Sequence, residues 1–211
     1  MTFTPPEATC QLCSRLVEFR NDNQRQWPDW HNAPVPSFGS LDASLLVVGL
    51  APGLRGANCT GRPFTGDYAG DLLYPSLKVF GLAGGDYQRR PDDGFMLKNT
   101  RITNAVRCVP PENKPTPAEQ NTCRPFLIDE LQAMPNLRVI LALGLIAHNA
   151  VLSTMKERKV SFPFSHGAQH HLGCGIVLAD SYHCSRYNVN TGRLTEEMFH
   201  QVLRNISPLL L

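Results

Sequence analysis

The stretch SLLVVGLAPGLRGANCTGRPFTGDYAGDLLYP (44–75) joins an apolar run to a helical pattern through one long loop. The apolar run at 44–50 indicates a buried strand, and the spacing of apolar residues over 68–80 predicts a helix. From Gly49 to Pro75 there are six glycines, three prolines and only two acidic residues. Glycine permits unusual backbone angles and proline restricts them. We therefore expect a loop of defined shape at the end of this strand.

Three more apolar runs predict strands at 100–106, 137–144 and 175–180. Helical patterns lie between or after them at 117–133, 145–155 and 195–206. Strands that alternate with helices predict a parallel sheet covered on both faces. The expected fold is therefore α/β, with three α/β/α layers and a central four-stranded, mostly parallel sheet. Ligands of such sheets bind beyond the carboxyl ends of the strands.

Capping signals mark where three of these helices begin. Thr116 with Glu119 forms a capping box, and Pro117 occupies the first helical position. Asp67 is expected to cap the first helix, and Thr195 the last.

Composition bounds the class of protein. The chain has 211 residues, of which 42% are hydrophobic and 18% charged, with a net charge of +2. These values predict one globular domain over residues 1–211 and exclude a protein that holds nucleic acid chiefly by a strongly basic surface. The N-terminus MTFTPPEATC has no signal-peptide pattern, and the longest apolar run, LRVILALGLIA, is too short to span a bilayer. We expect a cytoplasmic protein without a membrane partner.

Four of the seven cysteines have positions that suit a shared site. Cys10 and Cys13 form a CQLC pair in an N-terminal segment expected to be flexible, while Cys108 ends a strand and Cys123 falls inside the next helix. Their thiolates could meet at one edge of the sheet as a [4Fe-4S] or zinc site, or remain reduced structural thiols. Buried or half-buried structural thiols are expected at the other positions, Cys59, Cys174 and Cys184.

Four side chains are expected at the carboxyl edge of the sheet. Phe64 lies between Pro63 and Gly66, Asp67 follows closely, Asn104 ends a strand and His183 lies just past the last one. Each has an ordinary structural explanation: a core ring, a helix cap, a turn amide and a structural imidazole. Together they describe a pocket with an aromatic floor, an amide that reads a base edge, a carboxylate and a histidine.

The sequence resembles the fifth (type b) family of the uracil-DNA glycosylase superfamily. The matching pieces cover most of the chain in order: GLAPGLRGANCTGRPFTGD, ITNAVRCVPPENKPTPAE, HGA at 166–168 and HCSRYNVNTGRLT. The iron-sulfur branch of that superfamily has cysteines at matching positions, so the resemblance implies a [4Fe-4S] cluster on Cys10, Cys13, Cys108 and Cys123.

The resemblance also implies a role for each pocket residue. Phe64 matches the aromatic that stacks on an extruded base, and Asn104 the amide that reads its pairing edge. His183 matches the histidine that contacts the base oxygen near the scissile bond, and Asp67 supplies the carboxylate. The implied activity is monofunctional hydrolysis of the N-glycosidic bond, with Asp67 and His183 catalytic, as the first step of base excision repair.

Several related families carry an acidic or amide side chain where this sequence has Leu50 and Ala51. That loss implies a permissive pocket, and the type b family is associated with hypoxanthine and other deaminated bases besides uracil. Two residues, Cys59 and Cys184, depart from the family pattern, and neither has an assigned role.

The implied partner is DNA containing deaminated bases, in the nucleoid of a prokaryotic cell, with no obligate protein partner. Lys114, Arg186 and Arg193 are expected to contact phosphates. Lys114 is the only lysine in the motifs and lies in a Pro-rich loop, so we expect no lyase activity.

Three alternatives remain open on the sequence. One is a module of the same fold that binds a damaged base without cleaving it. Another is an electron-transfer iron-sulfur protein, which would leave the 49–75 loop unexplained. The last is a metal site formed by His166, His170 and His171.

Overall fold

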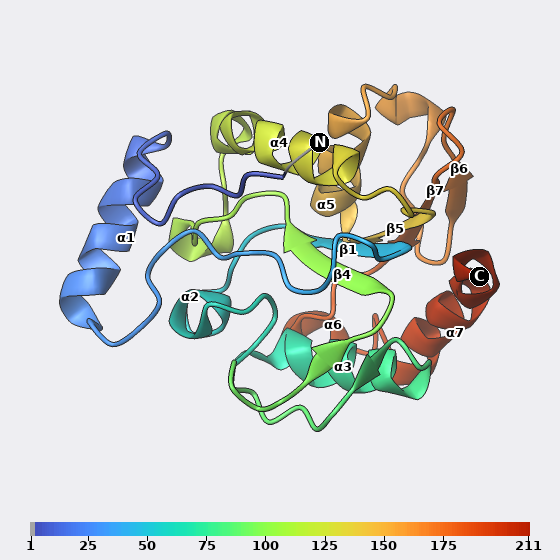
Figure 1. The fold of residues 1–211 in the computed structure, drawn as a ribbon, viewed down its shortest axis with the longest axis horizontal. Helices are drawn as coiled ribbons and strands as arrows, with labels where there is room; N and C mark the ends of the chain where they lie inside the picture. Colours follow the sequence, from blue (N-terminus) through green and yellow to red (C-terminus); the bar gives the residue numbers. More distant parts are fainter. Residues whose placement is uncertain (1–2) are drawn as a thin grey trace.

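The structure is a computed structural model that describes residues 3–211. Its centre is a five-stranded mixed sheet in the order β4-β1-β5-β7-β6 (Figure 1). Four strands are parallel, and the edge strand β6 runs antiparallel to β7. The strands are β1 (Leu45–Gly49), β4 (Thr100–Asn104), β5 (Val139–Leu143), β6 (Gln169–His171) and β7 (Val177–Ser181).

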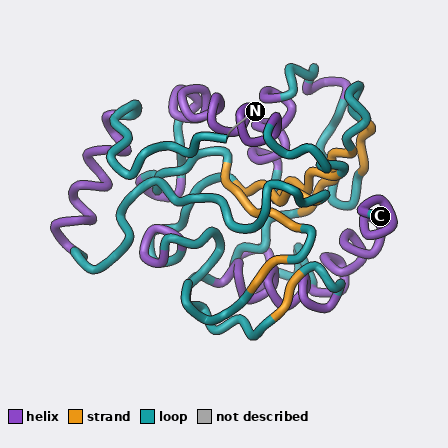
Figure 2. The backbone as a smooth tube through the Cα atoms, in the orientation of Figure 1, coloured by secondary structure: helices purple, strands orange, loops and turns teal. Residues whose placement is uncertain are grey.

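Seven α-helices surround this sheet within the described residues (Figure 1). Four of them, with their bounds, are α1 (Ser14–Gln26), α2 (Ala57–Thr60), α3 (Tyr68–Val79) and α4 (Pro117–Gln132). The others are α5 (Leu145–Thr154), α6 (Arg186–Asn190) and α7 (Glu196–Ile206). Long loops link α1 to β1 and α3 to β4, the latter interrupted by the small hairpin of β2 (Ala83–Gly84) and β3 (Met96–Leu97) (Figure 2).

Alternation along the strands explains the three layers. Leu45 and Val47 of β1 pack in one core with α3 and α7, whereas Leu46 and Val48 pack in another with α4 and α5. Successive strand residues face opposite sides, so a continuous apolar run fills both cores. The predicted α/β/α layering is confirmed.

The predicted count of four strands is wrong, because β6 adds a fifth. Its sequence is QHH, short and polar, and no apolar alternation marks it. The segment that carries Cys10 and Cys13 forms neither helix nor strand, and α1 begins directly after Cys13, so the expected flexibility of that segment stays a prediction. The capping predictions are confirmed: Thr116 forms its capping box with Glu119, and Thr195 accepts a hydrogen bond from the Met198 amide.

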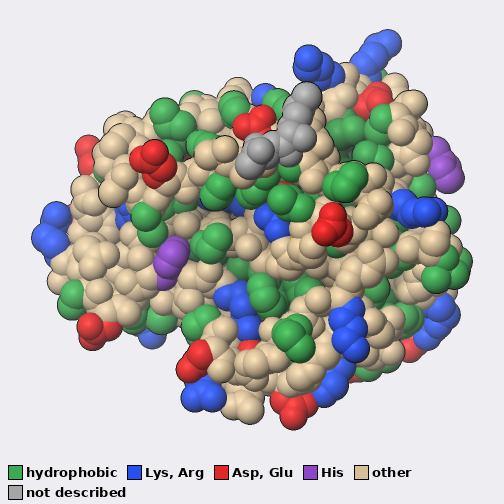
Figure 3. Space-filling view, viewed as in Figure 1, with side chains coloured by type: hydrophobic (Ala, Val, Ile, Leu, Met, Phe, Trp, Pro, Cys, Tyr) green, Lys and Arg blue, Asp and Glu red, His purple; other side chains and the backbone are tan. Residues whose placement is uncertain are grey.

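One face of the molecule shows how charge is distributed on it. On the face shown in Figure 3, basic and acidic side chains are interspersed. This agrees with the small net charge of +2. No helix among residues 3–211 combines the length and apolar character needed to cross a membrane.

Candidate active site

A cleft of about 620 Å³ opens where β1, β4 and β7 end at the carboxyl edge of the sheet. Parallel strands bring their carboxyl ends together, so segments far apart in sequence meet here. The predicted site residues that line this cleft are Leu50, Ala51, Phe64, Asp67, Asn104, His183 and Arg186.

Phe64 and Asn104 meet over the last residue of β1. Phe64 is 6% exposed and its ring centroid lies 6.0 Å from that of His183. A β-carbon placed on Gly49 would stand 2.5 Å from Phe64 Cζ and 2.4 Å from Asn104 Oδ1. Glycine at position 49 therefore lets the ring and the amide approach the backbone and form the inner wall of the cleft.

The backbone of Phe64 is held in a left-handed conformation, with φ of 53°. Such a conformation is costly for a bulky residue and needs support from its surroundings. The Tyr74 hydroxyl donates to the carbonyl of Pro63, and the Tyr87 hydroxyl donates to the carbonyl of Phe64 at 3.3 Å. These two tyrosines fix the orientation of the aromatic floor.

A buried ion pair anchors the same loop. Arg62 donates from both terminal nitrogens to Asp93, each at 2.8 Å. The Arg62 guanidinium holds the pKa of Asp93 well below its usual range, helped by the amides of Gln88 and Phe95. Sequence reasoning missed this pair, because 31 residues separate its members and no local pattern links them.

The two carboxylate oxygens of Asp67 have different surroundings. Oδ1 caps α3 by accepting a hydrogen bond from the Ala69 amide at 3.0 Å, as predicted, while Oδ2 lies toward Gly56. Burial raises the pKa of Asp67, the amides of Ala69 and Gly70 oppose the rise, and the nearby Asp71 adds to it. The carboxylate is therefore desolvated and stands at the edge of the cleft.

His183 follows β7 and is half-buried beside Phe64. Burial lowers the pKa of His183 to about 4, so its imidazole is neutral at neutral pH. Asn188 donates to the His183 carbonyl at 2.8 Å and fixes the backbone there. A neutral imidazole offers one N–H donor to the cleft.

The three predicted phosphate contacts differ in position. Arg186 lies over the Tyr68 ring at the cleft, with its guanidinium carbon 5.4 Å from the centroid. Arg193 lies instead over Tyr182 at 4.7 Å, and exposed Lys114 pairs with Glu112 at 3.4 Å. Neither of these two lines the cleft, whereas Arg55, which sequence reasoning did not single out, does.

The four predicted cysteine ligands line one cavity between α1 and α4. Burial raises the pKa of the thiols of Cys13 and Cys123, and that of Cys108 to about 12. The Arg107 amide donates toward Cys123 Sγ at 3.4 Å. Four cysteines that line one cavity, with an N–H donor beside Cys123, fit an iron-sulfur cluster held by four thiolates.

The three remaining cysteines have different surroundings. Cys184 is fully buried, and burial raises the pKa of its thiol. Cys59 is half-buried, as expected, but Cys174 is exposed in a Gly-flanked turn, so that prediction is wrong.

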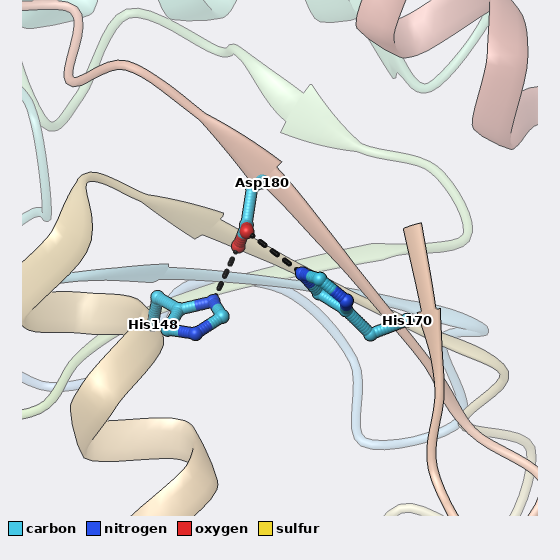
Figure 4. Close-up of side chains that lie close together, drawn as sticks. All are labelled: His148, His170 and Asp180. Carbon is cyan, nitrogen blue, oxygen red and sulfur yellow. Dashed lines mark hydrogen bonds and ion pairs between the residues drawn. The ribbon is translucent and has the colours of Figure 1, made fainter. Parts of the chain in front are cut away.

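The predicted histidine grouping does not form. His170 pairs instead with Asp180 at 3.2 Å, and His148 Nδ1 lies 2.7 Å from the other oxygen of Asp180 (Figure 4). His166 accepts from the Tyr182 amide, and exposed His171 neighbours His170 on β6 and points to the opposite face.

His148 and Asp180, both missed by sequence reasoning, tie α5 to β7. His148 Nε2 also lies 2.9 Å from the carbonyl of Phe162. Both nitrogens of His148 thus face oxygen atoms, and these two contacts hold the ring between β7 and Phe162. Ligand atoms of His148, His170 and Asp180 lie within 4.8 Å of one another, a spacing a metal ion can also bridge, but hydrogen bonds already join them.

Comparison with known proteins identifies the family. The model of the uracil-DNA glycosylase superfamily matches residues 36–207. A type-5 uracil-DNA glycosylase from Thermus thermophilus is 46% identical over 207 residues, covering 95% of this chain and 94% of the relative. Type-5 uracil-DNA glycosylases from Mycobacterium bovis and Pyrobaculum aerophilum are each 40% identical, covering 96% and 92% of this chain and 78% and 86% of those relatives.

These matches define the chain at two levels. It belongs to the uracil-DNA glycosylase superfamily and, within it, to the type-5 family. The resemblance drawn from the sequence motifs is confirmed.

Proposed function

We propose that this chain hydrolyses the N-glycosidic bond of uracil in DNA and so begins base excision repair. The observation that carries the proposal is the cleft in which Phe64, Asn104, Asp67 and His183 meet at the carboxyl edge of the sheet. The names of its type-5 relatives agree with that activity.

Base recognition rests on the inner wall of the cleft. An extruded base stacks on Phe64, and the Asn104 amide pairs with its edge, donating and accepting at once. Leu50 and Ala51 present no polar side chain to the opposite side of the base. The pocket therefore accepts other deaminated bases, including hypoxanthine.

Two groups act on the charges that develop during cleavage. Positive charge grows on the sugar, and the half-buried Asp67 carboxylate stabilises it and positions the attacking water. Negative charge grows on the departing base, and neutral His183 donates a hydrogen bond to it. The lining of the cleft contains no lysine among residues 3–211, which supports hydrolysis without a covalent lyase step.

Cys10, Cys13, Cys108 and Cys123 hold a [4Fe-4S] cluster in this proposal. When bound, the cluster supplies cross-links among α1, the segment after β4 and α4. The donor set supports it, because four thiols share one cavity. Arg186, with Arg193 and Lys114 farther out, contacts phosphates of the duplex.

The deciding experiment measures base release from duplexes with a single uracil or hypoxanthine. Wild type should release free base. Asp67→Asn should keep the helix cap and DNA affinity but lose roughly 10²-fold to 10⁴-fold in release. Asp71→Asn, one turn along the same helix, is the matched control and should retain release at neutral pH.

Other outcomes separate the alternatives. Tight binding without release from wild type would make the protein a damaged-base binder. Trapping of a covalent DNA adduct with borohydride would contradict the monofunctional assignment.

A further inference from the structure

Arg20 is a buried cation on α1. It is 5% exposed. Its Nη1 donates to Cys108 Sγ at 3.7 Å, and its Nη2 donates to the carbonyl of Cys10 at 2.9 Å. Within residues 3–211 no carboxylate forms an ion pair with it, whereas buried charges are ordinarily paired. Among the described residues, the one side chain that accepts a hydrogen bond from this guanidinium is thus Cys108, a proposed cluster ligand.

Arg20 occupies a position where the helix pattern favours an apolar side chain. The buried residues of α1 are Leu16, Arg20 and Asn23, which lie on one face at helical spacing. Leu16 packs in the same small core as Cys13, Cys108 and Cys123. The face of α1 that holds the helix against the cysteines therefore carries a charge in its middle.

Besides Arg20, a second group of buried arginines lies beside the cavity that the four cysteines line. Arg107 is 1% exposed, lines the cysteine cavity, and pairs with Glu130. Glu130 also pairs with buried Arg101, so one carboxylate serves two guanidinium groups. Cationic surroundings of this kind suit an anionic occupant, and an iron-sulfur core on four thiolates carries a net negative charge.

We propose that Arg20 is a positioning residue for the cluster, donating a charge-assisted hydrogen bond to the Cys108 sulfur and protecting the cluster from oxidation. This inference rests on the cluster assigned under the proposed function. Positive charge and hydrogen bonds to cluster sulfurs raise the reduction potential. With Arg20 in place, the bound cluster gives up an electron less readily.

The test compares Arg20→Met and Arg20→Lys with wild type, purified without oxygen. Arg25→Met is the matched control, because Arg25 lies on the same helix but is exposed and pairs with Asp22. Iron and sulfide per chain and the visible absorbance are measured, and then the rate of bleaching by ferricyanide. In that reaction one electron leaves the cluster and reduces ferricyanide to ferrocyanide, after which iron is lost.

Wild type and Arg25→Met should contain the same iron and bleach at the same rate. Arg20→Met should bleach several-fold faster, and Arg20→Lys, which keeps the charge but not the two-armed contact, should fall between. If Arg20→Met takes up no iron, Arg20→Lys decides the question. The inference is overturned if Arg20→Met holds iron and bleaches at the wild-type rate. It is also overturned if Arg20→Met holds no iron and Arg20→Lys bleaches at the wild-type rate.

The same samples separate this inference from the proposed function. Wild type without iron would contradict the cluster itself and the role of Arg20 with it. Wild type that holds iron but releases no uracil would contradict the glycosylase and leave the role of Arg20 standing.

Discussion

Gly56 lies directly against the carboxylate of Asp67. A β-carbon placed on Gly56 would stand 2.4 Å from Asp67 Oδ2 and 2.8 Å from its Cγ. Movement of the Asp67 carboxylate away from Gly56 would disturb its cap on α3, where Oδ1 accepts from the Ala69 amide. The loop at 49–75 thus needs this glycine to place the carboxylate.

Gly56→Ala should displace the Asp67 carboxylate and lower kcat for uracil release by roughly 10²-fold. Gly173→Ala is the control, since the nearest atom to its β-carbon would be 3.9 Å away. Single-turnover kinetics measures both. Equal rates in Gly56→Ala and wild type would contradict the close packing.

The pH profile should reveal the raised pKa of Asp67. Base release needs the carboxylate, so kcat/KM should fall in acid through a pKa above the ordinary aspartate range. The charge of Asp71 contributes to this rise. Asp71→Asn should therefore shift the acid limb to lower pH, and an unchanged limb would argue against Asp67 as the titrating group.

His183 should contribute no step in the pH profile near the ordinary histidine pKa, because burial keeps it neutral down to about pH 4. His183→Ala removes the donor and should cost roughly 10²-fold in kcat. His183→Gln retains an N–H and should lose less. A His183→Gln variant as slow as His183→Ala would point away from hydrogen bonding.

Salt should weaken DNA binding through phosphate contacts. Arg186→Ala should lower affinity for all duplex sequences and reduce the slope of log affinity against log salt by about one. Arg25→Ala, at an exposed position on α1, should leave the slope unchanged. Fluorescence anisotropy of labelled duplexes over a series of salt concentrations measures both the affinity and this slope.

Asp93→Asn should leave the buried Arg62 guanidinium without an anionic partner and lower the free energy of unfolding by about 3–5 kcal/mol. Asp86→Asn breaks only an exposed pair with Lys78 and should cost about 0–1 kcal/mol. The pKa of Asp93 is lower in the folded protein than in the unfolded chain. The ion pair therefore adds to the free energy of unfolding at pH values above the unfolded-state pKa, and this stabilisation is lost as the pH falls through the folded-state pKa. Urea denaturation at two pH values tests magnitude and sign, and equal stability in acid and at neutral pH would contradict the pairing.

The core strands and the residues of the cleft could be predicted because short stretches of sequence indicate them, either by an apolar run or by a motif. Runs such as LRVILALG are apolar throughout, since both faces of β5 are buried. Phe64, Asn104 and His183 each sit beside a strand end, and parallel strands place those ends together.

The missed features lack such signals. β6 is polar and pairs only at the sheet edge with β7, so its pairing depends on tertiary contact. Arg62 and Asp93, like His148 and Asp180, meet only after folding brings distant segments together. Arg20 lies on α1, for which the sequence analysis predicts no helix, and its contacts with Cys108 and Cys10 form only in the folded chain.

Ala51 borders two places at once: it lines the cleft and packs in the small core with Cys13 and Cys108. The Ala51 side chain thus connects the proposed base site with the small core that two of the proposed cluster ligands share. Loss of the proposed cluster would therefore loosen a wall of the substrate pocket. Iron starvation or oxidant stress would then lower repair capacity without any change in the amount of protein.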